Sequence, residues 1–221
     1  MTALDPLTAA DLARGVYGIM DDTNVPRALA SKGVGGLGNL FDLSQATVAQ
    51  GTSGLGRFKK DTGFAMVLPG KNSRQGELAV VTRGTATKYD WMSNVNAVST
   101  SGPTGHTVHS GFKQIFDSIE QSVDTALQGR NPSSIHCVGH SLGGALANLF
   151  AAKLTNQGHG VSLYTFGAPR VGMQGMTENL ETRLKTDIFR VYNSSDPVPL
   201  VPTYPYMHTP VSRGGLCVRT A

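Results

Sequence analysis

A short segment in the middle of the chain places the tightest limit on its fold. Gly139-His140-Ser141-Leu142-Gly143 directly follows the apolar run 135–138 and opens the Ala- and Leu-rich helical pattern 142–154. The serine has a glycine two positions before it and another two positions after it, and it stands between a strand and a helix. This arrangement is typical of a tight turn at the edge of a parallel sheet. The strand and helix around the segment matter, because a chain with 27 glycines in 221 residues can carry this motif by chance. In this context we interpret Ser141 as a candidate nucleophile.

The residues on both sides of this segment alternate between apolar runs and helical patterns. The predicted strands are 64–68, 78–82, 134–138, 161–166 and 187–192. The predicted helices are 112–127, 142–154 and 178–185. Strands that alternate with helices along the chain predict the α/β class, in which helices cover both faces of a mostly parallel sheet.

Residues 1–60 have a different pattern from the rest of the chain. One helix is predicted over 7–20, and Gly-rich stretches follow at 33–38 and 51–56. The stretch 33–38 matches G-x-G-x-x-G, but it neither follows an apolar strand nor precedes an acidic residue at the distance that dinucleotide binding requires. We predict a single domain over 1–221, with a helical and Gly-rich N-terminal extension over 1–60 and a catalytic core over 61–210.

Composition excludes several classes of protein. Charged residues make up 15% of the chain and the net charge is +4, which argues against disorder. No apolar run approaches the roughly 18 residues of a membrane span. The first six residues lack the features of a signal peptide, so we expect a cytoplasmic protein or export by a non-classical route. Two cysteines make no disulfide framework, and no Lys- and Arg-rich block indicates a nucleic-acid partner.

A nucleophilic serine requires a base and an acid. In hydrolases built on such a sheet, the acid and then the histidine follow the serine along the chain. Asp196 is the acidic residue that lies just past a predicted strand, where the active-site loops of parallel sheets gather. His208 is the one histidine after Asp196. We therefore predict that Ser141 attacks, that His208 takes its proton and that Asp196 orients the imidazole.

Five segments occur in an order that resembles the class 3 lipases, the family of filamentous-fungal triacylglycerol lipases and many bacterial relatives. They are 81–94 (VTRGTATKYDWMSN), 108–112 (VHSGF), 135–149 (IHCVGHSLGGALANL), 164–171 (YTFGAPRV) and 196–202 (DPVPLVP). The resemblance implies an α/β-hydrolase fold in a bacterial member of the family. It also implies hydrolysis of fatty-acyl esters at a lipid interface, without a metal or organic cofactor.

The resemblance also assigns two further groups of residues. Thr85 matches the oxyanion-hole residue, whose backbone N–H would act together with that of Leu142. The segment 86–105 matches the lid, in which Tyr89, Trp91 and Met92 would contact the substrate.

Three alternatives stay open at this point. The enzyme can be a phospholipase A1 that contacts a membrane surface, or the fold can be a non-catalytic module that binds lipid or a partner. His208 can match a non-catalytic histidine of the family, because fungal members place several tens of residues between the acid and the base, whereas 11 stand here between Asp196 and His208. The sequence does not predict which acyl-chain length the enzyme prefers, or its oligomeric state.

Overall fold

The computed structural model describes residues 3–53, 60–85, 98–185, 187–210 and 216–218. Its centre is a sheet of seven strands. In their order across the sheet these are β1 (Thr47–Ser53), β2 (Lys60–Pro69), β3 (Glu77–Thr82), β6 (Ser134–His140), β7 (Val161–Phe166), β8 (Ile188–Asn193) and β9 (Leu216–Val218). β1, β2 and β3 pair antiparallel, whereas β3, β6, β7, β8 and β9 run parallel. The carboxyl ends of the parallel strands therefore meet at one edge.

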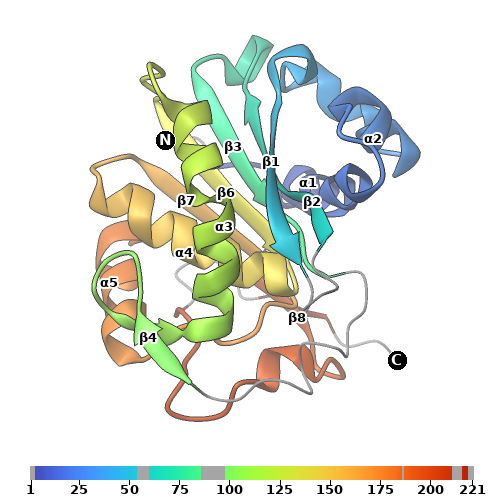
Figure 1. Cartoon of the computed structure of the whole chain (residues 1–221). Coiled ribbons are helices and arrows are strands. Elements are labelled where there is room, and N and C mark those ends of the chain that lie inside the picture. The colour runs from blue at the N-terminus through green and yellow to red at the C-terminus, as the bar shows by residue number, and fades with distance from the viewer. Residues whose placement is uncertain (1–2, 54–59, 86–97, 186, 211–215, 219–221) are drawn as a thin grey trace.

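Helices cover both faces of this sheet, as predicted (Figure 1). One face carries the helices that connect the parallel strands, namely α3 (Ser110–Leu127), α4 (Leu142–Asn156) and α5 (Gln174–Leu184). The other face carries α1 (Pro6–Gly15) and α2 (Val25–Ser31), which come from the N-terminal part of the chain. The α/β class with a mostly parallel sheet is confirmed.

Two hydrophobic cores lie on the two faces because side chains alternate along each strand. On β3, Leu78 and Val80 belong to the core under α3 and α4. Ala79 and Val81 belong to the core under α1 and α2. α4 is buried on nearly all sides, which explains why its sequence shows no polar face.

The N-terminal part differs in detail from the predicted extension. The predicted helix 7–20 consists of α1 and a 3-10 helix, Val16–Met20, that follows it directly. α2 and the edge strand β1 were not predicted, and β1 places residues 47–53 inside the main sheet. β1 is polar and contains Gly51, against which Ile119 of α3 packs, so its sequence lacks the alternating pattern of a strand.

The predicted lid is described only in part. β4 (Ser99–Ser101) pairs antiparallel with β5 (Thr107–His109). Tyr89, Trp91 and Met92 lie outside the described residues, so their predicted contact with substrate stays a prediction. Among the helices of the described ranges, none has the length and apolar character needed to cross a membrane.

Candidate active site

Ser141 stands at the turn between β6 and α4. Its backbone has φ 55° and ψ −130°, a conformation that residues other than glycine rarely adopt. The turn is held by a hydrogen bond from the Ser141 N–H to the Phe166 carbonyl at the end of β7, at 2.9 Å. Only 5% of the residue is exposed. A strained backbone that the surrounding structure holds in place is typical of functional sites.

The glycines around Ser141 allow the turn to close tightly and the backbone at the end of β3 to approach it. A Cβ atom on Gly139 would overlap the Gly143 carbonyl, and one on Gly143 would overlap the Thr82 carbonyl. The Thr82 hydroxyl donates a hydrogen bond to the Gly143 carbonyl at 2.6 Å. The end of β3 is thus fixed against the first turn of α4.

This contact brings the predicted oxyanion-hole segment beside the serine. A Cβ atom on Gly84 would stand 3.2 Å from Ser141 Cβ, and Thr85 is the next residue. Leu142 is the first residue of α4, where backbone N–H groups have no partner within the helix and the helix dipole favours an anion. The structure therefore brings Ser141, Leu142 and the Gly84–Thr85 peptide together.

Asp196 lies in the turn after β8, at the same edge of the sheet. Its Oδ1 accepts a hydrogen bond from the Val198 N–H at 3.1 Å. Its Oδ2 lies 3.0 Å from the position of a Cβ atom on Gly167, and His140 Nε2 lies 3.9 Å from the same position. Asp196 is thus close to the residue that precedes Ser141.

His208 is bound to the loop that contains Asp196. Its Nε2 donates to the Pro199 carbonyl at 2.7 Å, because a carbonyl can only accept. This bond fixes the neutral tautomer that leaves Nδ1 as an acceptor. Burial and the nearby Arg190 lower the pKa of His208 to about 4, so the ring is neutral at pH 7. No hydrogen bond joins His208 to Ser141 or Asp196, all three of which are described.

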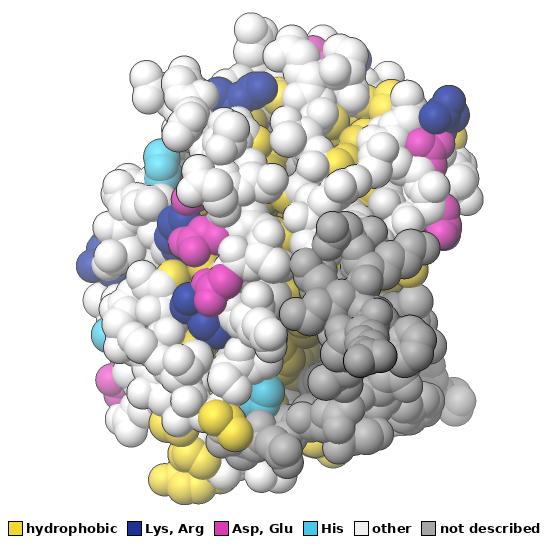
Figure 2. Space-filling view, in the orientation of Figure 1, with side chains coloured by type: hydrophobic (Ala, Val, Ile, Leu, Met, Phe, Trp, Pro, Cys, Tyr) yellow, Lys and Arg dark blue, Asp and Glu magenta, His cyan; other side chains and the backbone are white. Residues whose placement is uncertain are grey.

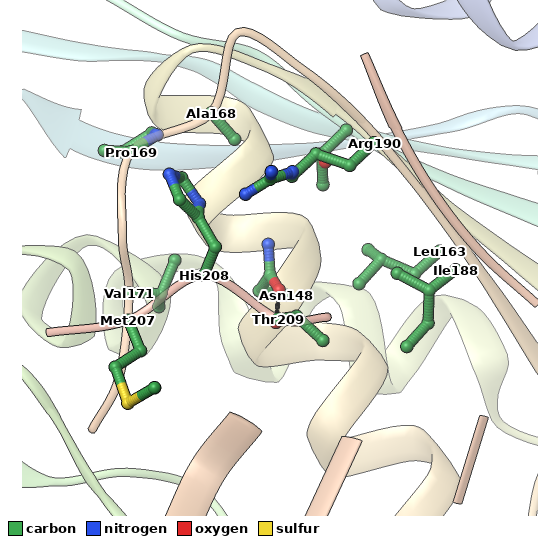
Figure 3. A pocket seen from close by; sticks show the side chains of 11 residues that line it. Asn148, Leu163, Ala168, Pro169, Val171, Ile188, Arg190, Met207, His208 and Thr209 are labelled. Carbon is green, nitrogen blue, oxygen red and sulfur yellow. Dashed lines mark hydrogen bonds between the residues drawn. The ribbon is translucent and has the colours of Figure 1, made fainter. Parts of the chain in front are cut away.

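His208 also lines a small pocket on the α4 side of β7 and β8, together with Asn148 and Arg190 (Figure 3). In this view the ring points towards Ala168 and Pro169. The catalytic assignments of Ser141, Asp196 and His208 therefore stay predictions, and that of His208 departs most from a triad geometry.

Comparison with known proteins identifies the family to which the chain belongs. The model of the family described as Lipase (class 3) matches residues 79–206, which is more than half of the chain. The chain belongs to the class 3 lipase family. The matched region runs from β3 to the residue two before His208, and includes Thr85, Ser141 and Asp196. Whether this member is bacterial stays a prediction.

Individual relatives agree with this membership. The chain is 33% identical over 156 residues to secreted mono- and diacylglycerol lipase 1 of Fusarium solani, covering 67% of this chain and 46% of that protein. It is 34% identical over 157 residues to a chloroplastic phospholipase A(1) of Arabidopsis thaliana, covering 59% of this chain and 35% of that protein. The chain thus spans less than half the length of these two curated relatives.

A solved structure confirms the α/β-hydrolase fold. The triacylglyceride lipase of Rhizomucor miehei is 21% identical to this chain, with a TM-score of 0.64. The match covers 92% of this chain and 76% of the lipase chain. At this level of identity the likeness shows the fold alone.

Three residues at the site were not predicted from the sequence. Tyr17 reaches the site from the N-terminal part, and its Oη lies 2.7 Å from His140 Nδ1. Arg83 donates from Nη1 to the Gly84 carbonyl at 2.6 Å. Arg83 and His140 lie within the motifs that contain Thr85 and Ser141, which is a signal that could have found them. Tyr17 carries no such signal, because only the fold brings residues 17 and 140 together.

Proposed function

We propose that this protein hydrolyses fatty-acyl esters at a lipid interface, with Ser141 as the nucleophile. The observation that carries the proposal is the strained turn at Ser141, packed against the Gly84–Thr85 peptide, in a chain of the class 3 lipase family. The relative from Fusarium solani, a mono- and diacylglycerol lipase, supports acylglycerols as the substrate class.

The proposed reaction is an acyl transfer to Ser141 and then to water. Ser141 Oγ attacks the ester carbonyl while the base takes the hydroxyl proton. The carbonyl oxygen, which becomes negative, accepts hydrogen bonds from the N–H groups of Thr85 and Leu142. The alcohol leaves with a proton from the base, and an acyl-enzyme remains. Water activated by the same base then releases the fatty acid.

In this proposal His208 is the base and acts through Nδ1. The ring is neutral at pH 7, which is the form that accepts a proton, but its pKa of about 4 makes it a weaker base than an ordinary histidine. The Pro199 carbonyl holds the required tautomer from Nε2. Asp196, three residues before Pro199 on the same loop, would stabilise the imidazolium only if its carboxylate approached the ring.

A second candidate function is hydrolysis of the acyl esters of phospholipids. The observation that favours it is the 34% identity to a plant phospholipase A(1). The two functions share Ser141 and differ in the lipid headgroup. Release of fatty acid from emulsified tributyrin and from phosphatidylglycerol vesicles separates them, since the preferred substrate shows the higher kcat/KM.

Ser141→Ala tests the proposal directly. The substitution removes the nucleophile and keeps the backbone of the turn, so ester hydrolysis should fall at least about 10³-fold while the melting temperature changes little. Ser133→Ala is the matched control, because Ser133 is exposed at the opposite edge of the sheet, and it should retain full activity.

A serine-directed organophosphonate adds a readout that does not depend on turnover. It should label the wild type and Ser133→Ala, but not Ser141→Ala. Wild-type hydrolysis by Ser141→Ala would reject Ser141 as the nucleophile. A wild type that is neither active nor labelled would reject the enzymatic proposal in favour of a non-catalytic module.

A further inference from the structure

Two side chains, those of Arg83 and Tyr17, contact the backbone of Gly84. Its carbonyl accepts a hydrogen bond from Arg83 Nη1 at 2.6 Å, and the Tyr17 hydroxyl lies against its backbone. The space is closely filled, because a Cβ atom on Gly84 would stand 2.5 Å from Tyr17 Oη. The Gly84 carbonyl and the Thr85 N–H belong to one planar peptide unit. A contact that fixes the Gly84 carbonyl therefore also orients the Thr85 N–H.

Arg83 supplies one side of this arrangement. Arg83 is only 2% exposed. On β2, its Nε donates to the Gly63 carbonyl and its Nη2 donates to the Thr62 hydroxyl. The guanidinium also lies 4.3 Å above the centre of the Phe64 ring. Burial of this charge is unfavourable and lowers the pKa of Arg83 to about 10. Its hydrogen bonds join the second strand of the sheet to the Gly84 carbonyl.

Tyr17 supplies the other side. It lies in the 3-10 helix Val16–Met20, and burial raises the pKa of its hydroxyl, which stays protonated at pH 7. The Tyr17 hydroxyl lies within hydrogen-bond distance of His140 Nδ1, at 2.7 Å, and also packs against Gly84. One hydroxyl thus contacts both Gly84, the residue before Thr85, and His140, the residue before Ser141.

We propose that Tyr17 is a positioning residue for the oxyanion hole, which holds Gly84, and through it the Thr85 N–H, in place beside Ser141. The N-terminal part of the chain then contributes directly to catalysis rather than only covering the sheet. The inference rests on the proposed esterase function. Its physical basis is that an oxyanion donor must be preorganised, and that a misplacement of about 1 Å can cost about 10²-fold in rate.

Tyr17→Phe tests the proposal by removing a single oxygen atom. We expect kcat on a soluble ester to fall about 10- to 100-fold with KM little changed, because the lost alignment matters only in the transition state. The affinity of a boronic acid inhibitor, whose adduct on Ser141 mimics the tetrahedral intermediate, should fall by a similar factor. If Tyr17 had only a structural role, removing its hydroxyl would change neither kcat nor the affinity for the boronic acid.

Tyr164→Phe is the matched control. Tyr164 is also a buried tyrosine whose hydroxyl binds the N-terminal part, accepting from the Leu4 N–H at 2.7 Å. It lies on β7, and none of its interactions involves Gly84, His140 or Ser141. This variant should lower the melting temperature while kcat and boronic acid affinity stay at the wild-type values.

Amide hydrogen exchange separates the inference from the proposed function. Exchange at Gly84 and Thr85 should become at least about 10-fold faster in Tyr17→Phe and stay unchanged in Tyr164→Phe. Unchanged exchange and unchanged kcat in Tyr17→Phe would overturn the inference. A wild type that hydrolyses no ester would reject the proposed function instead, and exchange at Gly84 and Thr85 would still decide whether Tyr17 holds this peptide.

Discussion

The hydrogen bond between His208 and Pro199 gives this histidine two separable functions. As the proposed base it needs a free nitrogen, Nδ1, and as an anchor it needs only the Nε2–H donor to the Pro199 carbonyl. Glutamine keeps an N–H donor but cannot accept a proton. We expect His208→Gln and His208→Ala both to lose about 10³-fold in kcat/KM, since members of a triad act as a unit. Activity retained in His208→Gln but lost in His208→Ala would show that His208 is an anchor.

The pH dependence of stability is the control for this experiment. A histidine whose pKa is lowered by folding binds its proton more weakly in the folded state, so stability is full above pH 6.5 and falls as the pH approaches 4. The expected loss is about 2 kcal/mol at pH 5. His208→Gln should remove this contribution in urea titrations at pH 7.5 and pH 5. Kinetics should therefore be compared at pH 7.5, where both proteins are folded.

At the scale of elements, the site depends on the contact between the end of β3 and the start of α4. Gly143→Ala would drive a methyl group into the backbone of Thr82 and Arg83, which cannot move without disturbing the sheet. We expect a loss of at least about 3 kcal/mol in the free energy of unfolding. Gly36→Ala is the control, because a Cβ atom there meets no atom within 4 Å, and its stability should change by less than about 1 kcal/mol. Equal stability of the two variants in urea titrations would contradict this account.

The elements that could be predicted from sequence are those whose pattern is set locally. The strand 161–166 is observed with the predicted bounds, and the predicted helix 112–127 begins two residues earlier at Ser110. β1 could not be predicted because it is a polar edge strand whose partner, β2, defines it. Ser141 could be proposed from local order, since strand, turn and helix are consecutive. Tyr17 could not, because its role arises only from a contact across 123 positions of the chain.

At the scale of the whole molecule, large apolar side chains are exposed on the loop after β8. Leu200, Tyr204 and Met207 are 61%, 87% and 41% exposed. β8 runs parallel to β6, so this loop starts at the sheet edge that also bears Ser141. Hydrophobic side chains also gather at the lower end of the face in Figure 2, the end where the loop lies in Figure 1. Exposed apolar groups beside a site are typical of a surface that contacts lipid or a partner.

Replacing two of these side chains tests whether the loop contacts the lipid interface. Each apolar side chain that enters lipid contributes about 1.5 to 3 kcal/mol. Leu200→Ser with Tyr204→Ser should therefore weaken binding to phosphatidylglycerol vesicles at least about 10-fold, and lower activity on emulsified tributyrin while activity on soluble p-nitrophenyl butyrate is retained. Leu7→Ser is the control, because Leu7 is 76% exposed on α1, on the opposite face from the connecting helices. If Leu7→Ser weakens vesicle binding as much as the double substitution, binding is non-specific and the loop after β8 is not the contact surface.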